Sequence, residues 1–301
     1  AELISRCLAK DPGQRPQSGR ELLQSLEILP NFADTTFVDV SERATNAARR
    51  ALALDSTLSE AHMSLALSFM HAFRWAEDDL QFQRAIATDP DDAAAHMQYG
   101  RFLVYTGRSQ EALTQMRRAK ELDPTSALIS SWFASSLLSH GMRDEAFAEI
   151  DRALEIDSMN PPIIFFGSHV MAARGDMDAA RRLLDRAPPL AVWRSAAAQA
   201  YAAMGDHDAV RRLSREVEAS TARSFRHSAL AGMALALNDA PRALDEFERA
   251  MRAKEFWPSA PILSTPIVDQ IRRSPRFEAL LRQAGLNVAI FTSPTGGRPA
   301  P

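Results

Sequence analysis

A 34-residue interval runs through this sequence and constrains its fold more than any other feature. Ala recurs at this interval from position 51 to position 187, Asp from position 55 to position 157, and Gly from position 107 to position 175. A fixed interval of this length predicts stacked units of two helices, each packed mainly against its neighbours. We therefore expect a chain that works through a surface rather than through a catalytic pocket.

The composition argues against several classes of partner and location. The net charge of −3 gives no general attraction to nucleic acid or to an anionic membrane, so we expect neither as a partner. The sequence has no apolar run of about 18 residues, the length that spans a bilayer. Cys7 is the single cysteine, so no internal disulfide can form, which fits a reducing, cytoplasmic compartment.

The most regular unit covers residues 93–126 and shows why the interval exists. Gly107 supplies the left-handed turn between its two helices, a conformation that a Cβ would strain. Gly100 and Ala119 are small at points where neighbouring helices cross, and Pro124 ends the second helix. The same pattern predicts full units at 59–92 and 127–160, followed by less regular units that turn at Gly175, Gly205 and Asn238.

The interval and these positions resemble the tetratricopeptide (TPR) repeat family. The resemblance implies an all-α fold, a right-handed α-solenoid of helix–turn–helix repeats. We expect the array at 42–254, with about six units of which the first is incomplete. A C-terminal cap is expected at 255–290, where Ser274 and Pro275 start the capping helix, and a disordered tail at 291–301. Residues 30–41 are expected to be a linker.

The first full unit departs from the repeat pattern at its turn. Phe73 stands where Gly is expected, and Asp78 stands where a small Ala is expected. The Trp75-Ala76 pair that follows Phe73 resembles the first full repeat of a bacterial subclass of these proteins. In that subclass the repeats follow a kinase, a cyclase or a winged-helix DNA-binding module.

Residues 1–29 lie outside the repeat. They contain Arg-Cys-Leu-Ala-Lys-Asp-Pro at 6–12, then Arg15-Pro16 and Glu21-Leu22-Leu23, which resembles the last two helices of a Ser/Thr protein kinase domain. In that family the arginine that matches Arg15 pairs with a buried Glu located upstream, which is absent here. The Gly-rich loop, the strand Lys, His-Arg-Asp and Asp-Phe-Gly are absent too. The resemblance implies a bacterial kinase–TPR fusion in which this fragment is not an enzyme; a chance amphipathic helix pair is the alternative.

No residue pattern indicates a cofactor, a metal or a catalytic group. The glycines are accounted for as turns, helix contacts and tail residues, which leaves none for a phosphate-binding loop. His62 and His96 are one interval apart, so they occupy equivalent positions in neighbouring units. Two histidines without carboxylates are a weak metal site, and equivalent packing of the two units is the favoured interpretation.

The predicted binding surface is the concave face, which the first helix of each unit lines in this architecture. Mapping the interval onto these helices places on it Met63, Leu67, Met70, Met97, Arg101, Val104, Leu128, Ser131, Ser135, Leu138, Phe165, His169 and Gln199. The stripe is mostly apolar with scattered polar groups. It lacks the Lys/Asn cluster with which similar proteins clamp acidic chaperone tails, so we do not expect such a tail as the ligand.

These features favour a protein- or peptide-binding module in a kinase-type signalling protein, with kinase substrates or the parent kinase domain as candidate partners. Two alternatives stay open. The activity could be that of the full-length parent, an ATP-dependent Ser/Thr protein kinase to which the repeats are accessory. The array could also be a homotypic assembly scaffold, which would make the chain a homo-oligomer.

Overall fold

The computed structural model describes residues 37–70, 73–186, 191–220, 225–253, 255 and 266–292. The kinase-like segment at 1–29 lies outside these residues, as do positions 293–301. Helices and turns account for the described part of the chain, which contains no strand. The prediction of an all-α solenoid built from helix–turn–helix repeats is confirmed.

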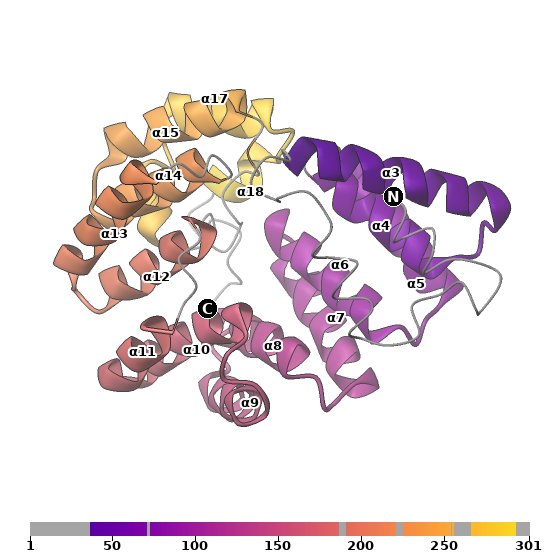
Figure 1. Cartoon of the computed structure of the whole chain (residues 1–301), viewed down its shortest axis with the longest axis horizontal. Coiled ribbons are helices and arrows are strands. Elements are labelled where there is room, and N and C mark those ends of the chain that lie inside the picture. Colours follow the sequence, from indigo (N-terminus) through magenta and orange to yellow (C-terminus); the bar gives the residue numbers. More distant parts are fainter. Residues whose placement is uncertain are drawn as a thin grey trace.

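The described helices form antiparallel pairs that follow one long initial helix (Figure 1). That helix is α3 (Phe37–Leu54). The pairs are α4 (Ser59–Met70) with α5 (Trp75–Thr88), α6 (Ala93–Tyr105) with α7 (Ser109–Leu122), α8 (Ala127–Ser139) with α9 (Arg143–Ile156), α10 (Pro161–Arg174) with α11 (Met177–Leu184), α12 (Ala191–Ala203) with α13 (His207–Ala219), and α14 (Arg226–Ala236) with α15 (Ala240–Arg252). A cap follows, made of the 3-10 helix η2 (Pro266–Gln270), α17 (Pro275–Gln283) and α18 (Val288–Thr292).

The turns lie where the 34-residue pattern predicts them. Gly107, Gly141, Gly175 and Gly205 have positive φ angles between 75° and 92°, and Asn238 adopts φ 58° in the same role. Asn tolerates this left-handed conformation better than most residues with a side chain. The second helix of the fourth full unit, α11, ends at Leu184, before the Ala-Pro-Pro run at 187–189.

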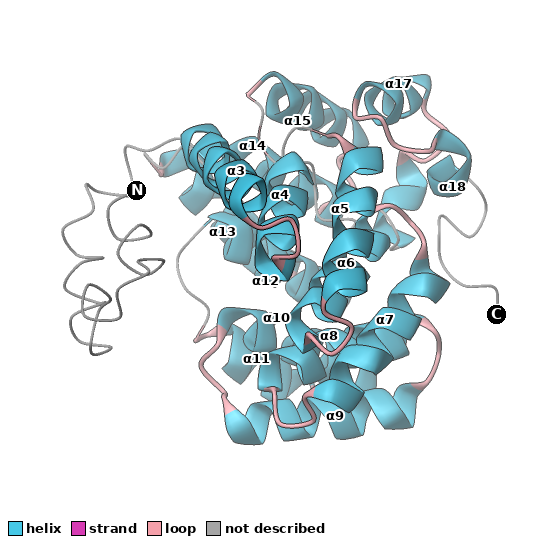
Figure 2. Ribbon diagram, turned by 90° about the vertical axis from the view of Figure 1, so that its right-hand side faces the viewer, coloured by secondary structure: helices cyan, strands magenta, loops and turns pink. Residues whose placement is uncertain are grey.

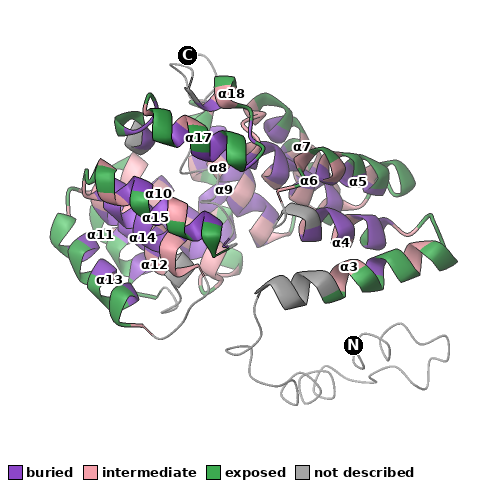
Figure 3. Ribbon diagram, turned by 90° about the horizontal axis from the view of Figure 1, so that it is seen from above, coloured by how far each residue is buried: buried purple, intermediate pink, exposed green. Residues whose placement is uncertain are grey.

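The first helices of the units form the inner layer of a curved array (Figure 1). Among the described elements, α4, α6, α8, α10 and α12 each contact the next first helix, whereas successive second helices have no contact of similar extent. This asymmetry bends the array, because the inner helices lie closer together than the outer ones. In Figure 3 the buried residues lie along the faces where helices pack, and exposed residues cover the outer sides.

A polar link holds the two helices of each early unit together. Nδ1 of His62 lies 2.7 Å from the side-chain amide of Gln81, and Nε2 donates to the Ser56 carbonyl over 3.2 Å. His96 repeats this arrangement with Gln115 and Pro90, at 2.6 Å and 3.0 Å. The interpretation of His62 and His96 as equivalent packing residues is therefore confirmed. His227 and Glu246, also 19 residues apart, form the same link in the last unit at 2.7 Å.

Replacing His96 with Ala is expected to lower the free energy of unfolding by about 1–3 kcal/mol, because the partly buried amide of Gln115 and the carbonyl of Pro90 lose their partner. Urea unfolding followed by circular dichroism measures the change. His207→Ala is the control, since His207 is exposed at the start of α13, and should change stability by less than about 0.5 kcal/mol. Equal stability of the two variants would show that the link adds no stability.

The C-terminal cap closes the array onto its first full unit. Phe277, Leu281 and Phe291 of the cap are fully or almost fully buried in one cluster with residues of α14 and α15. Phe73 and Trp75, from the irregular turn before α5, pack against the same cluster. The Trp75 indole Nε1 donates to the carbonyl of Ala284 over 2.6 Å, across 209 residues of sequence. Figure 2 shows α17 and α18 at the upper right, next to the upper end of α5.

Described helices extend across two of the expected boundaries at the ends of the array. The helix α3 begins at Phe37, within the segment 30–41 that was expected to be a linker and five residues before the expected start of the array at residue 42. Extending a helix that has already nucleated costs little, even through β-branched residues. At the other end, Phe291, the first residue of the segment expected to be a tail, lies in α18 and is fully buried. Its burial depends on a contact with the distant turn at Gly107, which local sequence does not show.

Candidate functional site

The structure divides the predicted concave stripe into buried and partly exposed residues. Met97 is 5% exposed and Ser131 is fully buried, so these two belong to the core and not to a free surface. Met97 packs in a cluster with Leu113 and Ile129, because its helix position faces the next unit. The side chain of Met70 is outside the described part. The partly exposed members are Met63, Leu67, Arg101, Val104, Leu128, Ser135, Leu138, Phe165, His169 and Gln199.

Arg101 of α6 is the one cation among the partly exposed stripe residues, and no member of that set is acidic. Its guanidinium lies over the Trp132 ring of α8, 4.7 Å from the ring centroid. Nη1 donates to Oε1 of Gln98 over 2.6 Å, whereas Nε is buried without a hydrogen-bond partner. No described carboxylate forms an ion pair with this guanidinium. Within the described part of the chain, Arg101 is thus a partly buried charge without a carboxylate partner.

A run of aromatic contacts continues from Trp132 to α10. The Trp132 and Phe166 rings meet edge to face at 4.4 Å, and Phe166 lies 4.9 Å from Phe165. Phe165 contacts the His169 ring edge-on at 4.5 Å. Together with Arg101, these residues cross three successive first helices, and we call them the inner strip: Arg101, Trp132, Phe165, Phe166 and His169.

Trp132 and Phe166 were not among the predicted site residues. A signal for them exists in the sequence, because Gln98, Trp132 and Phe166 are 34 residues apart, one position after the predicted column of 97, 131 and 165. The structure shows Trp132 partly exposed and Ser131 buried. On α6 and α8 the exposed column is therefore displaced by one residue from the predicted one, whereas on α10 the predicted Phe165 is partly exposed and Phe166 is buried.

His169 is electrically neutral at neutral pH. Burial lowers the pKa of this imidazole, which more than offsets the opposing effect of its hydrogen bond to the Phe165 carbonyl. Nδ1 lies 3.0 Å from that carbonyl oxygen, which can only accept, so Nδ1 carries the proton. Nε2 is then the acceptor of the neutral ring, and the inner strip combines a cationic donor at one end with a neutral acceptor at the other.

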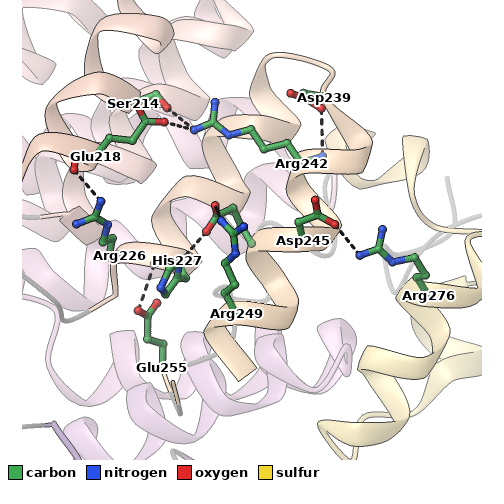
Figure 4. Close-up of polar contacts among 11 residues, drawn as sticks. Ser214, Glu218, Arg226, His227, Asp239, Arg242, Asp245, Arg249, Glu255 and Arg276 are labelled. Atoms are coloured by element: carbon green, nitrogen blue, oxygen red, sulfur yellow. Dashed lines mark hydrogen bonds and ion pairs between the residues drawn. The ribbon is translucent and has the colours of Figure 1, made fainter. Parts of the chain in front are cut away.

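The outer surface of the last units is occupied by charged groups that pair with each other (Figure 4). Arg242 reaches Glu218 on the preceding unit, and Arg276 of α17 forms an ion pair with Asp245 at 2.7 Å. Glu255 accepts from the backbone N–H groups of His227 and Ser228 at the start of α14. These contacts join consecutive elements, so they are structural and leave the inner strip as the candidate for binding.

The described residues contain neither a metal-binding cluster nor a membrane-spanning helix. No group of three or more His, Cys, Asp or Glu side chains is arranged to hold a metal ion there. Within the same part of the chain, no helix combines the length and the apolar character needed to cross a bilayer.

Comparisons with known proteins concern the fold alone. No family model matches the sequence, and no curated protein matches it either. Among solved structures, the APC/C hetero-tetramer Cut9–Hcn1 has a TM-score of 0.53 at 13% identity, and the match covers 81% of this chain and 46% of the matched chain. The human IFIT1 dimer with m7Gppp-AAAA has a TM-score of 0.51 at 16% identity, and the match covers 77% of this chain and 57% of the IFIT1 chain.

A third similar structure is PilF of Pseudomonas aeruginosa, with a TM-score of 0.46 at 19% identity over 62% of this chain and 86% of that one. This chain thus spans about half of the Cut9–Hcn1 and IFIT1 chains it resembles. The likeness supports the fold class already visible in the helix pairs, a TPR-type helical solenoid.

Proposed function

We propose that this chain is a non-catalytic protein- or peptide-binding module whose working surface is the inner strip with the partly exposed stripe residues around it. The observation that carries this proposal is the guanidinium of Arg101, which has no carboxylate partner in the described part of the chain, lying on a partly exposed Trp132. Stacked aromatic residues and Arg are enriched where proteins recognise partners. Arg118, Arg174, Arg242 and Arg276 form ion pairs within the chain, whereas Arg101 combines an aromatic contact with a buried Nε that has no hydrogen-bond partner.

The finer proposal is that the module belongs to a bacterial Ser/Thr kinase-type signalling protein in the cytoplasm. It rests on the kinase-like pattern at residues 6–23, outside the described residues. In such a parent, the array would recruit kinase substrates or bind the kinase domain itself. The parent would then supply the ATP-dependent activity, and this segment the recognition. Homotypic assembly is the alternative, and a protein that sediments as a concentration-dependent oligomer would favour it.

Phe165→Ala is expected to weaken partner binding about 10- to 100-fold, the loss of about 1–3 kcal/mol typical of an interface anchor. The matched control is Phe147→Ala: Phe147 is also partly buried, but it lies on the second helix α9 under Arg143 and Arg174. The partner is defined as the protein captured by the wild type and by Phe147→Ala but lost with Phe165→Ala. Calorimetry with the purified partner then measures the affinity.

Thermal melting of both phenylalanine variants separates binding from folding. We expect similar decreases in Tm, because both rings are partly buried and pack on neighbouring helices. If Phe165→Ala unfolds the array while binding per folded molecule is intact, Phe165 is a core residue and the inner strip is not the binding surface.

A further inference from the structure

We infer that the inner strip binds an extended peptide segment with an internal Asp or Glu, whose side-chain carboxylate pairs with Arg101 while neighbouring apolar side chains lie against Trp132 and Phe165. This inference rests on the proposed function and names the ligand chemistry of the same surface. Its first basis is the state of Arg101, a partly buried guanidinium with one hydrogen bond to a neutral amide and no carboxylate.

A carboxylate is the group that completes this site. Nε of Arg101 is buried and closed to a ligand, but the side chain as a whole is partly exposed. The two Nη groups at the end of a guanidinium can hold both oxygens of a carboxylate in parallel hydrogen bonds. Trp132 already holds the guanidinium plane, so little side-chain entropy is lost when the ligand binds. No Asp or Glu is among the partly exposed stripe residues to repel the incoming charge.

The position of Arg101 within the stripe favours an internal side chain over a chain terminus. Partly exposed apolar residues lie on both sides of it, with Met63 and Leu67 of α4 in the preceding unit and Trp132 in the following one. A bound segment can therefore continue past Arg101 in both directions. A terminal carboxylate at Arg101 would leave one half of this apolar surface uncovered.

The strip also sets the length of the segment. Packed helices lie about 8–10 Å apart, so the path from Arg101 on α6 to His169 on α10 is on the order of 20 Å. An extended chain advances about 3.3–3.6 Å per residue, which makes this path about six residues long. At the far end, the neutral His169 ring presents Nε2 as an acceptor for an N–H or O–H group of the ligand.

The test uses fluorescein-labelled octapeptides with blocked termini, rich in Phe and Leu, that differ only in a central Glu or Gln. Fluorescence anisotropy measures their affinity for the whole chain. We expect the Glu peptide to bind the wild type at least ten-fold more tightly than the Gln peptide. Arg101→Gln should remove this difference, and Arg101→Lys should keep part of it. Arg117→Gln, which removes an exposed arginine of α7, is the matched control and should keep all of it.

Each other outcome overturns the inference in an identifiable way. Equal affinity of the Glu and Gln peptides for the wild type would show that Arg101 does not select a carboxylate, although peptide binding itself would stand. If a Gln peptide with a free C-terminal carboxylate binds as tightly as the Glu peptide, Arg101 recognises the carboxylate of a chain end and not that of an internal side chain. If no peptide binds while the captured partner still depends on Phe165, the inferred ligand chemistry fails and the proposed function survives.

Discussion

Replacing Gly107 with Ala should lower the free energy of unfolding by about 2–5 kcal/mol and loosen the C-terminal cap from the first units. Two separate causes add at this position. Gly107 has φ 78°, where a residue with a Cβ costs about 1–2 kcal/mol. A Cβ would also lie 2.4 Å from Cγ2 of Ile290 and 3.4 Å from the Phe291 ring, so α18 would have to move.

Gly141→Ala is the matched control for the backbone cause alone. Gly141 occupies the same turn one unit later with φ 77°, and a Cβ there would meet nothing within 4 Å. We therefore expect Gly141→Ala to cost only about 1–2 kcal/mol. Chemical denaturation under the same conditions gives the free energy of unfolding of each variant. The difference between the two losses measures the steric conflict between the turn and α18.

A second substitution tests whether the cap is the cause. Ile290→Ala removes the methyl group that would clash, so the pair Gly107→Ala with Ile290→Ala should cost less than the two single changes added together. Hydrogen exchange should also show faster exchange in α17 and α18 for Gly107→Ala than for Gly141→Ala. If both glycine variants lose equal stability and the cap exchanges equally in both, the array is open in solution.

The closure also marks the limit of what the sequence predicts. Unit boundaries and turns depend on residues within one 34-residue interval, so the helices at 59–70, 93–105 and 127–139 begin where the pattern places their units. The pattern also identifies Phe73 as irregular, but it does not explain the irregularity. Phe73 adopts φ 56° and packs, with Trp75, against the cap more than 200 residues away, a contact that no local interval contains.

The candidate site stays a prediction. The choice of face followed from the 34-residue interval, and most of the stripe residues are partly exposed. The details depend on how neighbouring units rotate against each other. That rotation buries Met97 and Ser131 and exposes Trp132, one position further along the helix. The stacking of Arg101 on Trp132 joins two units, so the repeat of a single unit does not reveal it.

Asp78→Ala should raise the free energy of unfolding at pH 7 by about 2–3 kcal/mol, an uncommon direction for a core substitution. Asp78 is fully buried on α5, and neither of its carboxylate oxygens has a hydrogen-bond partner. The equivalent positions of the next units are the buried residues Ala112, Ala146 and Ala180, so Ala fits this helix crossing. A small cavity should offset about 1 kcal/mol of the gain.

The same group should make stability depend on pH. Burial raises the pKa of Asp78 to about 9 from its ordinary value of 3.8, and the neighbouring carboxylates of Glu77 and Asp79 act in the same direction. Between these two pKa values the folded chain holds a proton that the unfolded chain has released. Stability therefore falls as pH rises through this window, with a slope of up to about 1.4 kcal/mol per pH unit.

Urea unfolding of the wild type and Asp78→Ala between pH 5 and pH 8.5 tests this account. The gain in the free energy of unfolding should be small at pH 5 and should grow steadily toward pH 8.5. Only in the wild type does folding require a buried carboxyl to take up a proton, and this becomes less favourable as the pH rises. Asp144→Ala, which removes an exposed aspartate from the first turn of α9, should leave the pH dependence of the wild type in place. A gain that stays constant over this range would mean that Asp78 is ionised in the folded chain. The irregular position would then be stabilised by a counter-charge and not by protonation.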